Sequence, residues 1–294
     1  MKFSIITPTF NSEKHIEETM RSVFAQCGNF DVEYFIVDNM SSDRTVEIVE
    51  NNIKNLGKYK KNKGSFEVKF IIKNECSMYE AINHGFSFAS GDVYAWINSD
   101  DIYIEGAFSS VVSAFNLSPC VKWVKGITNY IDEDGFFSRN GCCYLYAQGL
   151  IRRGLYGREA YFIQQDSVFW RSELWQSTGG LDANFKIAGD YHLWMKFAEL
   201  APLYSLNRPV SCFRKVKGQL SENLAAYRQE QERIPRPFSP RNWLLGKFFV
   251  LLEPQLPDWL KFPLFRLLCP FAPLCCIDLD GDAVNVRKSF RYMV

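Results

Sequence analysis

The chain has 294 residues, 47% of them hydrophobic and 16% aromatic, and a formal net charge of +1 at pH 7. So many apolar residues exclude a disordered protein, and the length suits one large domain or a domain with an appendage. The small net charge gives no indication of a nucleic-acid partner. Nine cysteines, with no Cys-x-x-Cys pair, fit the reduced thiols of a cytoplasmic protein better than a disulfide framework or a zinc site.

Strand and helix signals alternate in the first half of the chain, which predicts an α/β fold with a mostly parallel sheet. Short apolar runs rich in β-favouring residues predict strands over residues 3–7, 32–37, 67–72 and 93–97. Helical spacing of apolar residues predicts helices after Asn11 or Ser12, over 45–55 and over 78–89. Between the last two, the lysine-rich stretch 54–63 is interpreted as a solvated loop.

Two adjacent carboxylates, Asp100 and Asp101, follow the predicted strand 93–97. In open α/β sheets, ligands bind at the carboxyl ends of the strands. Neighbouring carboxylates repel each other unless a cation joins them, and hard oxygen ligands suit Mg²⁺ or Mn²⁺ carrying a substrate diphosphate. A solvated loop after the strand would explain the same residues.

Further along, the pattern predicts a helix over 106–115, an extended run over 121–131 and a turn at 132–135. Asp190 precedes an apolar helical face made by Leu193, Trp194 and Phe197, so it lies at or near the amino end of a helix. A carboxylate there gains from the helix dipole. Asp190 is therefore either a helix cap or a catalytic group.

Together these motifs resemble the inverting glycosyltransferases of family 2, which have the GT-A fold. The resemblance covers about residues 3–230 and rests on motifs at 5–11, 36–45, 79–92, 98–101, 165–171, 179–182 and 189–194. It implies a glycosyltransferase domain over residues 1–233. A Rossmann-like nucleotide-sugar half would occupy about 1–105, and an acceptor half about 106–233.

The resemblance also implies roles for the matching residues. The donor would be contacted by Thr7, Pro8, Thr9, Phe10, Asp38, Asn39 and Asp100. Asp101 would coordinate the metal and Asp190 would be the catalytic base, while the acceptor side would include Gln165, Asp166, Trp170 and Arg171. The chain departs from the family pattern at Asn39 and Asn98, where acids are common, and at Gln164, where His is common.

The implied reaction moves a sugar from a nucleoside-diphosphate donor, with UDP expected before GDP or dTDP, to a glycan or lipid-linked glycan. Mn²⁺ or Mg²⁺ would offset the charge on the leaving diphosphate, and one carboxylate would take the acceptor proton. A single displacement inverts the anomeric centre. One alternative is a sugar-nucleotide nucleotidyltransferase, disfavoured because no Gly-rich basic loop follows the first strand. The other is a non-catalytic nucleotide-sugar-binding or scaffold protein.

Residues 234–294 form an apolar and aromatic extension that is expected to be mostly helical, after a proline-rich linker at 234–240. Charges and prolines interrupt its apolar runs before they reach the roughly 20 residues of a membrane-spanning helix. Two interpretations stay open. The extension docks on the core, or residues 241–276 touch the cytosolic face of a membrane peripherally.

Overall fold

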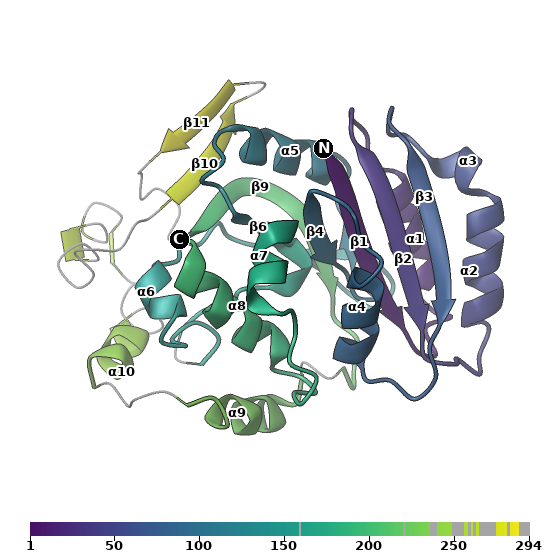
Figure 1. Ribbon diagram of the computed structural model, residues 1–294. Helices are drawn as coiled ribbons and strands as arrows, with labels where there is room; N and C mark the ends of the chain where they lie inside the picture. Colours follow the sequence, from purple (N-terminus) through teal and green to yellow (C-terminus); the bar gives the residue numbers. More distant parts are fainter. Residues whose placement is uncertain are drawn as a thin grey trace.

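The computed structural model describes residues 1–158, 160–219, 222–235, 240–248, 256–257, 260, 263–264, 275–280 and 283–287 (Figure 1). Its strands are β1 Lys2–Thr9, β2 Asp31–Asp38, β3 Phe66–Ile72, β4 Val93–Trp96, β5 Ile102–Tyr103, β6 Trp123–Ile131, β7 Phe137–Arg139, β8 Val168–Arg171, β9 Leu203–Arg214, β10 Cys275–Asp280 and β11 Ala283–Arg287. Its helices are α1 Ile16–Phe24, α2 Thr45–Lys54, α3 Leu56–Tyr59, α4 Met78–Phe86, α5 Ala107–Asn116, α6 Gln148–Ile151, the 3₁₀ helix η1 Gln165–Ser167, α7 Ser172–Thr178, α8 Gly189–Leu200, α9 Leu224–Glu232 and α10 Pro240–Lys247.

The described strands form one sheet in the order β11-β10-β9-β6-β8-β4-β1-β2-β3, with β5 pairing to β9 and β7 to β6. The run β4-β1-β2-β3 is parallel throughout, whereas β8 lies antiparallel between β4 and β6. The expected α/β architecture is confirmed, and so are the four strands expected in the first hundred residues.

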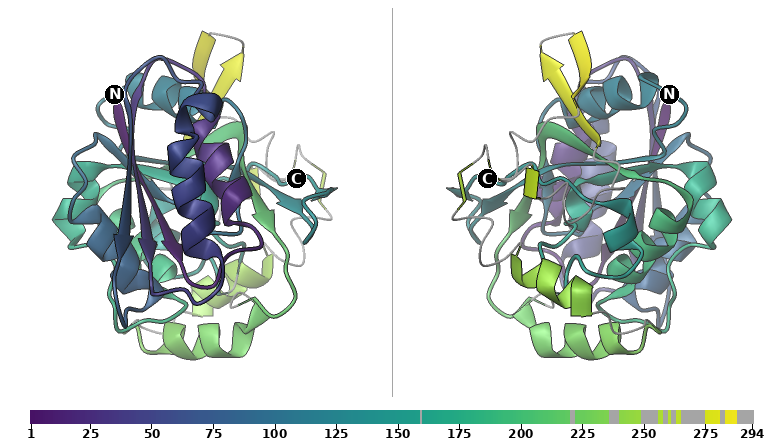
Figure 2. Two further views of the ribbon diagram at one scale, coloured as in Figure 1. Left: turned by 90° about the vertical axis from the view of Figure 1, so that its right-hand side faces the viewer. Right: turned by 90° about the vertical axis from the view of Figure 1, so that its left-hand side faces the viewer.

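Helices cover both faces of this sheet. Figure 2 shows α1 and α2 on one side of the strands β1 to β3, and α4 and α7 on the other. The strands β1, β2 and β4 are therefore almost entirely buried, with Phe3, Ile5 and Ile6 of β1 fully inaccessible to solvent. A parallel sheet buried on both faces gives the continuous apolar runs that the sequence shows.

A cluster of tryptophans packs where the two halves of the domain meet. The ring of Trp96 from β4 stacks on Trp194 from α8, and Trp170 from β8 contacts both in edge-on geometry, with centroid separations of 5.4 to 5.9 Å. Trp123 from β6 also stacks on Trp194. Each of these aromatic pairs stabilises the packing by about 0.5–1.5 kcal/mol beyond area burial. Both halves thus share one core.

The expected cap of α1 is wrong. The helix begins at Ile16, His15 occupies its N-cap position, and no side chain caps it; the main-chain carbonyl of Ser12 accepts hydrogen bonds from the N–H groups of His15 and Ile16. The side chains of Asn11 and Ser12 are used elsewhere: the Asn11 carbonyl oxygen accepts from the N–H of Ser42, and the Ser12 hydroxyl lies 2.8 Å from that of Ser99. The stretch 54–63, expected to be a loop, contains the short helix α3.

The C-terminal extension contributes the helix α10, as expected, and also two strands that the sequence did not predict. β10 pairs in parallel with β9, and β11 turns back against β10, so the extension lengthens the central sheet. Within the described residues, no helix has the length and apolarity to cross a bilayer. The linker at 236–239 and most of 249–274 lie outside the described residues, so membrane contact through 241–276 stays a prediction.

Candidate active site

A cavity of about 1230 Å³ opens at the carboxyl ends of β1 and β4. In Figure 1 this is the lower edge of the sheet, along which α9 runs. Parallel strands place their carboxyl ends and following loops at one edge, which is why segments distant in sequence meet here. Of the residues expected in the site, the cavity is lined by Pro8, Thr9, Phe10, Asn39, Asp100, Asp101, Gln165, Asp166 and Asp190.

Thr7 and Asp38 do not line the cavity, although both were expected to contact the donor. Both are fully buried. The Asp38 carboxylate accepts hydrogen bonds from the hydroxyl of Thr9 and the N–H of Ser41, each at 2.8 Å. In this arrangement Asp38 fixes the loops after β1 and β2 to each other.

Asn39 and Phe10 reach the cavity from those two loops. The Asn39 amide oxygen accepts a hydrogen bond of 3.1 Å from the N–H of Cys76, which leaves its NH₂ group without a partner among the described residues. The Phe10 side chain is 60% exposed at the cavity wall. An exposed aromatic ring beside an amide donor gives a flat ligand both a stacking surface and a polar contact.

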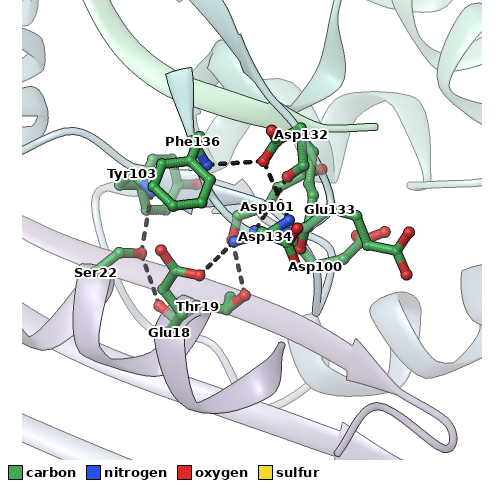
Figure 3. A network of polar contacts seen from close by, with 11 residues as sticks. Glu18, Thr19, Ser22, Asp100, Asp101, Tyr103, Asp132, Glu133, Asp134 and Phe136 are labelled. Atoms are coloured by element: carbon green, nitrogen blue, oxygen red, sulfur yellow. Dashed lines mark hydrogen bonds and ion pairs between the residues drawn. The ribbon is translucent and has the colours of Figure 1, made fainter. Parts of the chain in front are cut away.

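The two carboxylates after β4 differ sharply in their surroundings (Figure 3). Asp101 is 1% exposed, and its Oδ1 accepts a hydrogen bond of 2.9 Å from the N–H of Arg214. Its Oδ2 is buried and has no hydrogen-bond partner in the part of the chain that the structure describes. Burial, with the nearby charges of Asp100 and Asp166, raises the pKa of Asp101 well above its usual range. Asp100 is half-buried, so of the two it is the one whose carboxylate a ligand reaches more readily.

Asp190 lies in the first turn of α8, as the sequence predicted. Its Oδ1 accepts a hydrogen bond of 3.3 Å from the hydroxyl of Tyr227 on α9. The carboxylate of Glu230, also on α9, accepts from three successive N–H groups just before the helix, those of Lys186, Ile187 and Ala188. Helix α9 therefore holds both the carboxylate and the turn that presents it.

Burial raises the pKa of Asp190 to about 6, and the hydrogen bonds it accepts oppose this rise. A carboxyl group with a pKa near neutrality takes up a proton more readily than an ordinary aspartate while still being ionised at pH 7. These are the properties of a general base.

The four residues expected on the acceptor side separate into two pairs. Gln165 and Asp166 line the cavity; Gln165 donates to the carbonyl of Trp96, and the buried Asp166 accepts from Ser211. Trp170 and Arg171 do not line it. Trp170 is fully buried in the tryptophan cluster, and the Arg171 guanidinium donates to the carbonyls of Val121 and Phe115. In this structure they serve the core.

Sequence reasoning missed several residues that line the cavity. They lie at the start of α1 and in the segment after β9, and include Lys14, His15, Lys215, Lys217, Gln219 and Tyr227. The closely spaced Arg214, Lys215 and Lys217 at the end of an apolar run were the available signal. Cationic side chains at a cavity suit a phosphate-bearing ligand.

A family model described as glycosyl transferase family 2 matches residues 4–175. The chain belongs to this family. One curated relative is the poly(ribitol-phosphate) beta-N-acetylglucosaminyltransferase TarS of Staphylococcus aureus, 35% identical over 102 residues, 34% of this chain and 16% of TarS. Chondroitin synthase of Escherichia coli is 23% identical over 216 residues, 72% of this chain and 28% of that protein. The chain spans well under two thirds of either relative.

Solved structures place this family 2 chain in the GT-A fold. TarS residues 1–349, in complex with UDP-GlcNAc, align with a TM-score of 0.56 and 18% identity over 92% of this chain and 71% of that one. A mannosyltransferase from Pyrobaculum calidifontis, in complex with GDP-Man and Mn²⁺, gives a TM-score of 0.58 and 16% identity over 91% and 74%. At these identities the likeness shows the fold alone.

The residues of the site fit a divalent cation that arrives with a diphosphate. Within the described residues, no group of three or more His, Cys, Asp or Glu side chains is placed to enclose a metal. Mg²⁺ and Mn²⁺ do not require such a cage, because one or two carboxylates, substrate phosphates and water complete their shells. Among the described residues, Oδ2 of Asp101 has no hydrogen-bond partner, and burial beside Asp100 and Asp166 disfavours its charged form; a cation bound there would stabilise that form.

Proposed function

We propose that the chain is a metal-dependent, inverting glycosyltransferase that moves a sugar from a nucleoside-diphosphate sugar to an acceptor hydroxyl by single displacement. The observation that carries the proposal is one cavity lined by two carboxylate sites with different chemistry. Asp100 and Asp101 follow β4, and Asp190, with its pKa raised to about 6, begins α8. Family membership supports glycosyl transfer as the reaction class.

In this proposal the donor lies along the carboxyl ends of β1, β2 and β4. Phe10 stacks on the nucleotide base, and the free NH₂ of Asn39 donates to one of its carbonyl oxygens. Lys14, Lys215 and Lys217 provide positive charge near the diphosphate. UDP is the first donor to test, then GDP and dTDP, since solved neighbours hold UDP-GlcNAc and GDP-Man.

Asp100 is proposed as the main carboxylate ligand of Mn²⁺ or Mg²⁺. Asp101, the first expectation for the metal, is 1% exposed and one of its oxygens accepts a hydrogen bond from the Arg214 N–H, so it is proposed as a secondary contact of the cation. When bound, the cation stabilises negative charge on the leaving diphosphate.

Asp190 is proposed as the base. Its carboxylate takes the proton of the acceptor hydroxyl as that oxygen forms its bond to the anomeric carbon and the bond to the diphosphate breaks. No enzyme nucleophile is needed, and one displacement inverts the configuration. Aromatic side chains at the cavity, among them Tyr130, Phe162, Phe213 and Tyr227, suit the apolar faces of a glycan acceptor, free or lipid-linked.

The first test is calorimetric titration with UDP, GDP, dTDP and CMP, each with and without Mn²⁺, followed by transfer assays with the matching sugar nucleotides. Metal-dependent binding of one nucleoside diphosphate, with transfer that Asp190→Asn abolishes, is the expected result. Binding without transfer to any glycan acceptor would instead support a nucleotide-sugar-binding or scaffold protein. Release of pyrophosphate from a sugar phosphate and a nucleoside triphosphate would identify a nucleotidyltransferase.

A further inference from the structure

One side chain outside the expected motifs contacts the carboxylate of Asp100. Gln219 lies in the segment after β9, and its Nε2 donates to Asp100 Oδ2 at 2.8 Å and to the carbonyl of Arg214 at 2.7 Å. An amide NH₂ group has two hydrogens, so both are used. The Gln219 side chain is thus fixed at two points, one of which is a carboxylate that lines the cavity.

The second of those points is itself rigid. Arg214 is 1% exposed, and its guanidinium donates to the carbonyl of Asp100 at 2.8 Å and to the carbonyls of Asp132 and Glu133 at 3.3 and 3.2 Å. It also pairs with Glu18 of α1. Figure 3 shows Glu18, Asp132 and Glu133 gathered around Asp100 and Asp101.

Hydrogen bonds link Asp100, Arg214 and Gln219 to one another in a ring. Arg214 holds the main chain of Asp100, Gln219 holds its carboxylate, and the Arg214 carbonyl holds Gln219. A half-buried aspartate has freedom about χ1 and χ2 unless something limits it. Here Oδ2 of Asp100 accepts a hydrogen bond from Gln219. This contact fixes the orientation of the carboxylate, and therefore the direction of Oδ1.

We propose that Gln219 is a positioning residue that orients the Asp100 carboxylate toward the divalent cation. The inference rests on the proposed function and deepens it at the same site. A neutral amide suits this role, because it aligns the carboxylate and leaves its negative charge available to attract the cation. A lysine at this position would neutralise that charge. Hydrogen-bond partners of metal-binding carboxylates generally tune metal affinity in this way.

The competing explanation is that the contact merely tethers the segment after β9 to the rest of the cavity. That segment also carries Lys215 and Lys217, which line the cavity. If Gln219 were a tether, its loss would loosen these lysines and weaken nucleotide binding whether or not metal is present. If Gln219 orients Asp100, its removal should weaken binding of the metal ion and leave metal-free nucleotide binding unchanged.

The test compares Gln219→Met, which keeps the length of the side chain but donates no hydrogen bond, with the wild type. Calorimetry measures Mn²⁺ affinity in the presence of saturating UDP, and UDP affinity in the absence of metal. We expect Mn²⁺ to bind about 10- to 100-fold more weakly, with metal-free UDP affinity and the thermal unfolding midpoint unchanged. Gln229→Met, in an exposed position on α9 outside the cavity lining, is the matched control and should behave as the wild type.

Unchanged Mn²⁺ affinity in Gln219→Met would overturn the inference, and so would an equal loss of UDP affinity with and without metal. Failure of the wild type itself to bind Mn²⁺ with any nucleoside diphosphate would instead remove the proposed function. The two failures are therefore distinguishable in one experiment.

Discussion

The hydroxyl of Tyr79 accepts a hydrogen bond of 3.0 Å from the N–H of Gly189, although 110 residues separate the two in sequence. Tyr79 belongs to α4, and Gly189 immediately precedes Asp190 in α8. The position of the candidate base is therefore set directly by a contact with α4. A Cβ at residue 189 would lie 2.5 Å from the Tyr79 ring, closer than side chains tolerate.

Gly189→Ala should therefore displace the start of α8 and lower the transfer rate by about tenfold or more, since small misplacements of reacting groups are costly. Donor binding, measured by calorimetry, should change little because the nucleotide contacts lie elsewhere. The control is Gly149→Ala in α6, where an added Cβ meets nothing within 4 Å. Equal transfer rates in the two variants would show that the Tyr79 contact does not govern Asp190.

The raised pKa of Asp190 predicts how transfer depends on pH. Below about pH 6 the carboxyl group is protonated and cannot act as a base. The rate of transfer should therefore increase about tenfold per pH unit below 6 and level off above about pH 7. Initial rates in Mn²⁺ at saturating donor measure this profile. Asp190→Asn should be inactive at every pH; an active variant would mean that Asp190 is merely a helix cap.

The raised pKa of Asp190 also predicts how stability depends on pH. Stability should decrease as the pH rises, whereas the transfer rate increases. Its pKa rises from the ordinary 3.8 to about 6 on folding, so the stability it contributes at low pH is lost as the pH rises through about 6. Asp190→Asn should accordingly increase the free energy of unfolding at pH 8 by up to about 3 kcal/mol and have little effect at pH 4. Urea unfolding at both pH values tests this, and an equal effect at both would contradict it.

Phe10→Ala should weaken binding of UDP and GDP alike, by about tenfold, because stacking on an aromatic ring stabilises a bound base by about 1–3 kcal/mol whatever its identity. Stability should not change, since the ring is 60% exposed. Phe88→Ala is the control, as Phe88 is 51% exposed and does not line the cavity. Loss of UDP affinity in the control variant as well would point to a general structural effect.

Asp100→Asn and Asp101→Asn should differ in their effect on Mn²⁺. The first removes a half-buried charge at the cavity and should lower Mn²⁺ affinity by about tenfold or more. The second keeps an acceptor for the N–H of Arg214 and changes a group that is 1% exposed, so its effect should be smaller. Calorimetry with UDP and Mn²⁺ measures the Mn²⁺ affinity of both variants. A larger loss of affinity in Asp101→Asn would identify Asp101 as the main metal ligand instead.

Trp170→Phe should lower the free energy of unfolding by about 1–3 kcal/mol through lost packing, without raising the KM for the acceptor. Trp170 is fully buried against Trp96 and Trp194 and does not line the cavity. Urea unfolding and acceptor kinetics on the same preparation separate the two effects. A raised KM with unchanged stability would restore Trp170 to the acceptor side.

The sequence predicted elements wherever one local pattern dominates. Buried parallel strands such as β1 and β2 are continuous apolar runs, and α8 has a clear apolar face after Asp190. The same patterns, read through family resemblance, named nine of the residues that line the cavity. They failed where a side chain had two plausible uses: Asn11 and Ser12 suit a helix cap but bind neighbouring loops instead.

Contacts between segments that are distant in the sequence could not be predicted from a single sequence. Nothing in local spacing distinguishes Asp101, which turns inward to the N–H of Arg214, from its neighbour Asp100. Trp170 and Arg171 share a motif with Gln165, yet the strand β8 places Trp170 in the core and Arg171, which is half-buried, away from the cavity. The partners of Asp100 and Asp190, Gln219 and Tyr227, come from a segment with weak periodicity.

Arg214 and Glu18, which form an ion pair, lie 196 residues apart in the sequence. This contact can therefore form only late in the synthesis of the chain. Asp101 leaves the ribosome 113 residues before the N–H that accommodates its carboxylate. At about 5–20 residues per second, the segment up to Asp101 is complete for roughly 6–20 seconds before this contact can form. We expect a nascent chain halted before residue 214 to fold its first strands and yet bind no metal. Competence for the cation would then be acquired near the end of synthesis of the catalytic domain.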